Sequence, residues 1–178
     1  MFLNKIKLFL VISICLIFFF LTYNDVKSKE IKNISGTAIV TDGDSIKINN
    51  RKIRLVGIDA PELKQTCKYG VTEYPCGEMS KEWLDLLVEN FQITCSYSEK
   101  DQYKRILGVC YIGNINSVAF EKKVKSLELN SMMVKSGHAV AYRKYSVAYI
   151  EDEDYAKANN LGIWKMNFEF PWDYRRKN

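Results

Sequence analysis

The sequence is poor in proline and histidine and has no strong excess of charge of either sign. Only three of its 178 residues are Pro and only one is His, and no internal repeat or low-complexity stretch interrupts it. These scarcities exclude collagen-like and wholly disordered chains, because hydrophobic residues make up 47% and charged residues 26% of the total. The balance predicts an ordinary globular protein with a single domain.

The net charge is small, and part of it lies at the N-terminus. The chain carries a formal charge of +5, from 26 basic and 21 acidic residues. Four basic and two acidic residues fall in the first thirty positions, so the rest has 22 minus 19, or +3. Binding to nucleic acid depends on how Lys and Arg cluster, so this sum does not by itself indicate such a partner.

Residues 1–30 have the pattern of an export signal. Two lysines precede an apolar run over 8–21 that only Ser13 interrupts, and polar residues follow. No small-x-small cleavage motif is present, and residues 6–23 approach the roughly 18 to 20 residues that can span a bilayer. An uncleaved anchor with the lysines inside is therefore an alternative. We expect residues 31–178 to be periplasmic, secreted or held at the membrane by 6–23.

Four cysteines lie beyond the leader, at positions 67, 76, 95 and 110. An even number in an exported domain predicts two disulfides. Of the three possible pairings we prefer Cys67–Cys76, which closes a short loop, and Cys95–Cys110, which joins two consecutive strand-like runs. A zinc site is the rival, but the sequence has no CxxC pair, and His138 is distant from the cysteines.

The first part of the domain is predicted to be an antiparallel β-meander. Its β-type runs lie at residues 34–40, 45–49 and 52–58. Asp42-Gly43 and Asn49-Asn50 separate these runs and are favoured in tight turns. Pro61 ends the third run, because proline cannot donate a hydrogen bond to a strand ladder.

The remaining elements complete an α+β fold. We expect a helix over 77–90, strands over 91–98 and 106–112, a helix before Gly137 and another between 145 and 160. The charged run 118–128 reads as a solvated insertion or a helix extension. Five short strands with one inserted helix and about two C-terminal helices predict a five-stranded OB-type β-barrel.

Two aspartates and one arginine stand out in the meander. Asp44 opens the second run and Asp59 closes the third, so both lie at the edge away from the Asn-Asn turn. In a straight ladder they would be about four residues, or roughly 13 Å, apart, so the strands must bend before both can hold one ion. Two carboxylates and a carbonyl suit Ca²⁺ or Mg²⁺, although both could be plain turn residues. Arg54, inside an apolar run, either needs an anionic partner or faces outward.

Three sequence blocks show a resemblance to the thermonuclease family, the micrococcal nuclease-like OB-fold enzymes. The blocks are DGDSIKI (42–48), RKIRLVGIDAPE (51–62) and DQYKR (101–105). Weaker likeness extends the resemblance from Ser35 to Trp164. The YPCG around Cys76 and the terminal PWDYRR resemble an exported bacterial branch of that family.

The resemblance implies a reaction and a role for each residue. One Ca²⁺ ion would be bound by Asp44, Asp59 and the carbonyl of Ala60, Glu62 would orient or deprotonate the attacking water, and Arg54 and Arg105 would stabilise the transition state. Guanidiniums and a dication suit phosphodiester hydrolysis, because negative charge develops on the equatorial phosphate oxygens. We therefore expect an endonuclease, a phosphodiesterase acting on DNA and RNA with little sequence specificity.

The barrel face would bind the substrate. Bases would stack on Tyr103, Tyr142 and Tyr145, and phosphates would contact Lys104, Arg143 and Lys144. Such a surface suits single-stranded or frayed nucleic acid bound by a monomer. The tyrosines could instead be packing residues. His138 reads as a cap or core residue. Lys104 replaces the glycine usual in the family, and a positive φ would strain it.

Two other functions are weighed against catalysis. A catalytically inactive nucleic-acid-binding OB module at the cell envelope predicts the loss of at least one of four residues, but Asp44, Arg54, Glu62 and Arg105 are all present. A structural or oligosaccharide-binding OB domain leaves the acidic edge without a purpose. The sequence therefore favours the nuclease.

Overall fold

The computed structural model describes residues 29–178. The predicted leader, including the possible anchor at 6–23, lies outside the described residues apart from its last two positions. Residues 31–178 form one compact unit. Within 29–178, no helix combines the length and the apolar character needed to cross a bilayer.

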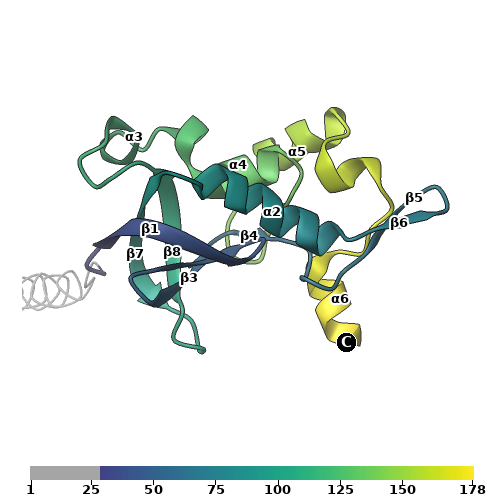
Figure 1. The fold of residues 1–178 in the computed structure, drawn as a ribbon, viewed down its shortest axis with the longest axis horizontal. Helices are drawn as coiled ribbons and strands as arrows, with labels where there is room; N and C mark the ends of the chain where they lie inside the picture. The colour runs from purple at the N-terminus through teal and green to yellow at the C-terminus, as the bar shows by residue number, and fades with distance from the viewer. Residues whose placement is uncertain (1–28) are drawn as a thin grey trace, which may run out of the picture. The chain divides into compact units, whose positions relative to one another are not determined.

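Five strands close into a barrel, which confirms the predicted α+β fold around an OB-type barrel. They follow the order β1-β2-β3-β8-β7 around it. Figure 1 labels β1, β3, β7 and β8 of this barrel. Their bounds are β1 Lys32–Asp42, β2 Ser45–Ile48, β3 Arg51–Leu55, β7 Gln92–Lys100 and β8 Ile106–Ile112. Asn49 and Asn50 have φ angles of 49° and 61°, as a tight two-residue hairpin turn requires. The barrel closes where β3 pairs with β8 in parallel.

The predicted third strand, 52–58, is wrong in extent, because the chain turns within it. β3 ends at Leu55, and Gly57 has a φ of 80°, a conformation that disfavours side chains other than glycine. The chain then forms β4 (Ile58–Asp59), which leaves the barrel and pairs with β9 (Val140–Ala141). This turn carries Asp59 out of the straight ladder that the sequence suggested.

Aliphatic side chains from alternate strand positions fill the barrel. Fully buried residues include Ile46, Ile48, Ile53, Leu55, Ile93 and Ile106. Helix α2 (Cys76–Val88) adds Leu84 and Val88 to this core, and helix α4 (Leu129–Lys135) adds Leu129 and Met133. The Cys95–Cys110 disulfide joins directly paired positions of β7 and β8 inside the same core. This confirms one of the two predicted pairings.

The charged run 118–128 forms short helical pieces beside β8. Helix α3 (Val118–Glu121) begins after Ser117, whose side chain accepts a hydrogen bond from the Phe120 amide, and η1 (Lys125–Leu127) follows. Phe120 is buried and packs edge-on against Tyr111 of β8. The insertion is therefore attached to the barrel through an aromatic contact.

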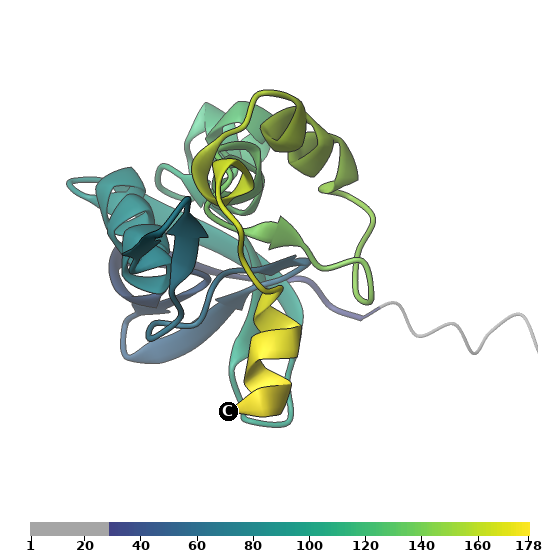
Figure 2. The same ribbon diagram turned by 90° about the vertical axis from the view of Figure 1, so that its right-hand side faces the viewer.

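The C-terminal part forms a second, smaller core with the loop that follows β4. Helix α5 (Ile150–Ala158) packs against α4, and the chain then continues into η2 (Gly162–Lys165) and a helix that the sequence did not predict, α6 (Pro171–Lys177). Figure 2 shows this segment descending from the helices to α6. Its aromatic side chains pack around the second predicted disulfide, Cys67–Cys76, which is confirmed.

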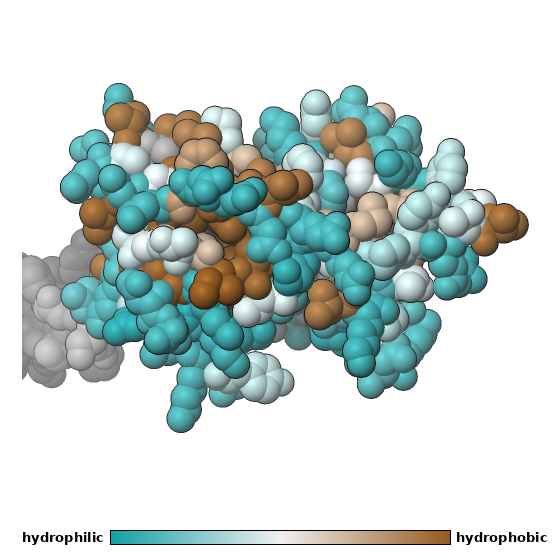
Figure 3. All heavy atoms as spheres, viewed as in Figure 1, coloured by the Kyte–Doolittle hydropathy of each residue, from teal (hydrophilic) through white to brown (hydrophobic). Residues whose placement is uncertain are grey.

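A hairpin also extends from this second core. Strands β5 (Cys67–Tyr69) and β6 (Thr72–Tyr74) form it, and Lys68 exchanges two backbone hydrogen bonds with Asn167. An apolar group stands out at the tip of the hairpin, where Val71 is fully exposed, whereas hydrophilic side chains predominate around α6 (Figure 3).

Candidate active site

Asp44 and Asp59 meet across a single guanidinium. Arg54 Nη1 lies 2.7 Å from Asp44 Oδ2, and Arg54 Nη2 lies 2.8 Å from Asp59 Oδ1. Asp59 is fully buried and Asp44 is nearly so. The two carboxylates are thus within reach of one planar cation, and Arg54 has the anionic partners that its place in an apolar strand required.

The turn at Gly57 brings the two carboxylates together. Because β4 leaves the barrel, Asp59 approaches Asp44 instead of lying farther along the ladder. The next residue, Ala60, donates its backbone N–H to Asp44 Oδ2 at 2.9 Å. A Cβ on Gly43 would lie 2.7 Å from the Ala60 Cβ, so the Asp-Gly-Asp turn needs glycine to approach this closely.

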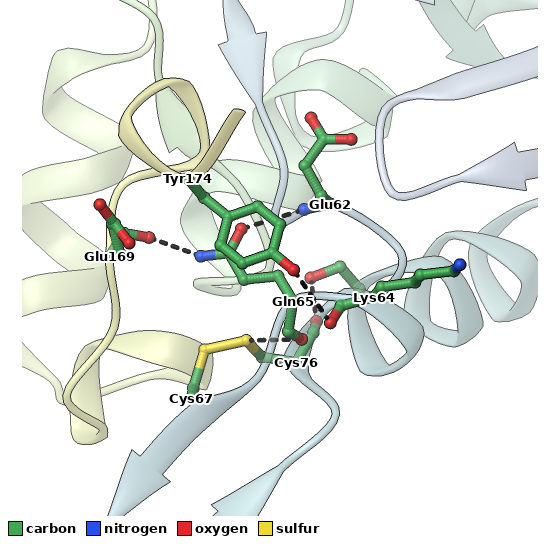
Figure 4. The surroundings of a disulfide bond; sticks show 8 residues. Glu62, Lys64, Gln65, Cys67, Cys76, Glu169 and Tyr174 are labelled. Carbon is green, nitrogen blue, oxygen red and sulfur yellow. Dashed lines mark hydrogen bonds between the residues drawn. A yellow bond between two sulfur atoms is a disulfide. The ribbon is translucent and has the colours of Figure 1, made fainter. Parts of the chain in front are cut away.

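Glu62 lies on the loop after β4, and its backbone is fixed at several points (Figure 4). Its amide donates to Gln65 Oε1 at 3.1 Å, and its carbonyl accepts from the Gln65 amide at 2.7 Å. Gln65 is fully buried beside the Cys67–Cys76 disulfide. A Cβ at Gly77 would lie 1.8 Å from the Glu62 carbonyl oxygen, so only glycine allows α2 to begin this close. The Glu62 side chain is 39% exposed.

A third arginine, which the sequence analysis missed, enters this site from α6. Arg175 Nη2 lies 2.8 Å from Asp59 Oδ2, and Arg175 Nη1 lies 2.6 Å from Glu62 Oε1. Nη1 also donates to Asp59 Oδ1 at 3.0 Å. The available signal was the terminal PWDYRR, in which Pro171 occupies the first turn of a helix and basic residues follow. Arg175 thereby links Asp59 with Glu62.

Burial and charge set the protonation behaviour of this edge. Burial raises the pKa of Asp44 to about 7, although the Arg54 guanidinium opposes the rise. Burial would lower the pKa of Arg175, but its hydrogen bonds to Asp59 and Glu62 raise that pKa above the ordinary value. A cationic group is therefore favoured between Asp59 and Glu62.

Arg105 lies on the turn between β7 and β8 and is fixed there by Asp101. Arg105 Nε lies 2.7 Å from Asp101 Oδ2, and the Arg105 amide donates to Asp101 Oδ1 at 2.9 Å. Burial would raise the pKa of Asp101, but these hydrogen bonds from Arg105 lower that pKa below its ordinary value. Arg54 pairs with Leu107 of β8, so Arg105 directly precedes the strand that lies beside Arg54. No ion pair or hydrogen bond among residues 29–178 joins Arg105 to Asp44, Asp59 or Glu62.

Lys104, which stands where the family usually has glycine, adopts a positive φ. Its φ is 64°, in the left-handed region that lysine adopts at a cost.

We expect Lys104→Gly to raise the free energy of unfolding by about 1 kcal/mol, because glycine removes the clash of Cβ. Arg105 keeps its contacts with Asp101, so a fall in kcat/KM would report the phosphate contact predicted for Lys104 itself. Urea unfolding measures the stability.

The matched control is Lys100→Gly, at a paired position of β7 without a positive φ, which should lose about as much stability as Lys104→Gly gains. Destabilisation by both substitutions would show that the left-handed turn carries no relievable strain.

The aromatic residues predicted to bind bases lie in two places. Tyr103 is 71% exposed at the tip of the β7–β8 turn, with Arg105 over its ring at 5.5 Å. Tyr142 follows β9 and stacks on Trp172 of α6 with ring centroids 5.4 Å apart, and exposed Tyr145 packs edge-on against it. Tyr142 therefore packs against α6 while remaining half-buried.

The predicted phosphate contacts differ in their surroundings. Arg143 is held by Glu153, with Nη1 2.6 Å from Oε2. Lys144 lies over the ring of Tyr145, 5.7 Å from its centroid. His138 stacks on Trp83 at 4.8 Å, and burial lowers its pKa to about 4. It is thus neutral at physiological pH and matches the predicted core role.

Two of the metal ligands predicted from the sequence are the carboxylates of Asp44 and Asp59, and the third is the carbonyl of Ala60. Among the described residues, no group of three or more His, Cys, Asp or Glu side chains is arranged to hold a metal ion. Asp44 and Asp59 approach one cationic group, Arg54, and the backbone of Ala60 lies against Asp44. Oxygen donors of this kind are those that hard cations prefer.

The fold and this edge define a class of protein: an OB-type barrel with an acidic site flanked by arginines. A family model described as "Staphylococcal nuclease homologue" matches residues 52–166. Because this match spans more than half of the chain, the protein belongs to the staphylococcal nuclease homologue family, as the sequence resemblance predicted. It is therefore a member of a nuclease family.

Several curated proteins are similar to this chain. The succinoglycan biosynthesis protein ExoI of Rhizobium meliloti is 31% identical over 76% of this chain and 67% of its own length. An uncharacterized endonuclease of Haemophilus influenzae is 32% identical over 82% of this chain and 75% of its own length. The probable endonuclease LCL3 of Phaeosphaeria nodorum is 35% identical over 71% of this chain but only 43% of its own length.

Proposed function

We propose that the protein is a Ca²⁺-dependent endonuclease that hydrolyses phosphodiester bonds in DNA and RNA with little sequence specificity. The observation that carries this proposal is the Arg54 guanidinium held between Asp44 and Asp59, with Glu62 at the same edge. Cations and carboxylates this close can bind a phosphodiester and activate water next to it. Membership of a nuclease family supports the same reaction.

Each residue has a defined task in this hydrolysis. The guanidiniums of Arg54 and Arg105 bind the phosphate oxygens and offset the charge that develops as water attacks phosphorus. The Glu62 carboxylate accepts a hydrogen bond or the proton from that water. The water oxygen forms a new bond to phosphorus, the P–O ester bond breaks, and the leaving oxygen takes a proton from solvent to become a hydroxyl.

Asp44, Asp59 and the Ala60 carbonyl are the residues that would hold the Ca²⁺ ion. Its charge supplies further stabilisation of the phosphate oxygens when it is bound. Asp44 and Asp59 are buried and share one cation, Arg54, which supports the proposal that these oxygen ligands also bind a divalent ion.

Exposed Tyr103, Tyr145 and Lys104, together with Tyr142, would bind single-stranded or frayed nucleic acid by stacking and phosphate contact. We propose that the protein acts as a monomer. The two disulfides indicate a compartment outside the reducing cytoplasm. We therefore propose that it is exported, and is periplasmic, secreted or anchored by residues 6–23.

The test is cleavage of denatured DNA by the purified protein in Ca²⁺ or in chelator. We expect cleavage in Ca²⁺ and none in chelator, with Glu62→Gln and Arg105→Ala each lowering kcat/KM by about 10²- to 10³-fold. Lys52→Ala, on an exposed position of β3, is the control and should be near wild type. Inactivity in Ca²⁺ would favour a binding module without catalysis, whereas activity untouched by both substitutions would refute the roles proposed for Glu62 and Arg105.

A further inference from the structure

The C-terminal helix α6 delivers one arginine to the carboxylate edge. Three basic residues follow one another at its end, and they have different partners. Arg175 contacts Asp59 and Glu62, whereas Arg176 pairs with Asp173 and Lys177 pairs with Glu169. Arg175 is the member of this group whose guanidinium enters the proposed site.

Contacts outside the site fix the position of α6. Pro171 is buried at its first turn, and the Trp172 ring is stacked between Phe170 at 4.6 Å and Tyr142 at 5.4 Å. The Tyr174 hydroxyl donates to the Lys64 carbonyl at 3.3 Å (Figure 4). These contacts place Arg175 without relying on its ion pairs.

The same segment is also tied to the loop of Glu62. The Gln65 side chain donates to the Glu169 carbonyl at 2.6 Å, and its oxygen accepts from the Glu62 amide at 3.1 Å (Figure 4). One buried amide therefore connects the segment leading into α6 with the Glu62 backbone. Both the backbone and the carboxylate of Glu62 are fixed by the C-terminal segment, the latter through Arg175.

We propose that Arg175 is a positioning residue of the nuclease site, which fixes the Glu62 carboxylate and lowers the negative charge at Asp59. This inference rests on the proposed function. The Glu62 side chain is 39% exposed, so without Arg175 nothing among its side-chain contacts in residues 29–178 would restrain its carboxylate. A water-activating carboxylate needs a defined direction to be effective.

Arg175 also changes the net charge of the site. With all groups ionised, Asp44, Asp59 and Glu62 against Arg54 and Arg175 sum to −1, and removal of Arg175 makes the sum −2. A more negative site binds a divalent cation more tightly but binds a phosphodiester anion less well. Arg175 therefore favours substrate at the expense of Ca²⁺ affinity.

The experiment compares the full chain with Arg175→Ala, Arg175→Gln, Arg175→Lys and, as the matched control, Arg176→Ala. Calorimetry measures the Kd for Ca²⁺ alone, and cleavage of denatured DNA at saturating Ca²⁺ gives kcat and KM. Loss of Arg175 should tighten Ca²⁺ binding about 3- to 10-fold and lower kcat about 10- to 100-fold. Arg175→Lys should recover part of kcat, and Arg176→Ala should change neither quantity. Arg175→Gln serves if Arg175→Ala fails to fold.

Two results would overturn the inference. An unchanged Kd together with an unchanged kcat would show that Arg175 only docks the helix. A kcat that rises when Arg175 is removed would show that α6 blocks the site. If wild type itself cleaves nothing, the proposed function fails, but the Ca²⁺ affinities still decide on Arg175, because an unchanged Kd then overturns the inference by itself.

Discussion

Replacing Arg54 by Ala is expected to abolish detectable nuclease activity and to destabilise the fold. The guanidinium is nearly buried between Asp44 and Asp59, so its loss leaves two close carboxylates without the cation that they share. Breaking a buried ion pair from one side costs roughly 3–5 kcal/mol, and Arg175 still compensates Asp59, so we expect about 3 kcal/mol. Loss of a guanidinium at the phosphate lowers kcat by about 10³-fold or more.

Ca²⁺ should restore part of the stability of Arg54→Ala. A cation bound by the folded state alone adds about 2.7 kcal/mol at a concentration of 100 times its Kd. Urea unfolding at pH 8, in chelator and in Ca²⁺, measures the difference. Arg51→Ala, at an exposed position of the same strand, is the control and should change stability by no more than about 0.5 kcal/mol. Equal stability of wild type and Arg54→Ala in chelator would refute the shared-cation account.

Removing the two disulfides one at a time should separate stability from activity. Loss of Cys95–Cys110 should lower mainly the stability, and loss of Cys67–Cys76 should lower kcat. Cys95 and Cys110 are fully buried in the barrel and 15 residues apart, so Cys95→Ala with Cys110→Ala should lower the free energy of unfolding by about 3 kcal/mol. The folded fraction should keep its activity, because the barrel strands remain paired.

The Cys67–Cys76 disulfide instead lies beside Gln65, which fixes the backbone of Glu62. We expect Cys67→Ala with Cys76→Ala to lower kcat about 10-fold or more, because the Glu62 loop loses its closure. The two double variants are each other's controls, with kcat measured well below the unfolding transition. If the barrel variant lost kcat and the loop variant did not, this division of roles would be wrong.

Local signals in the sequence were sufficient for the barrel and for its cross-links. Asn49-Asn50 specifies its turn within two residues, because Asn tolerates positive φ. Cys95 and Cys110 lie in consecutive strands, so a hairpin pairs them directly. The Lys104 conformation could also be anticipated, since a glycine position filled by another residue points to a left-handed turn.

Local sequence signals could not predict that the two carboxylates lie close together. Asp44 and Asp59 meet because the chain turns at Gly57 and β4 leaves the barrel to pair with β9. A single glycine in a β-type run is compatible with a straight strand, a bulge or a turn. The pairing with β9, which lies far away in sequence, selects the turn.

The sequence by itself determined the fold class, the disulfide pairs, the family and the residue types of the site. Only the tertiary structure decided which charges meet. Arg175 is 116 residues from Asp59, and it reaches that carboxylate because Trp172 and Tyr174 dock α6 beside the Glu62 loop. Local propensities act over a few residues, whereas such a contact depends on the packing of aromatic side chains from distant segments.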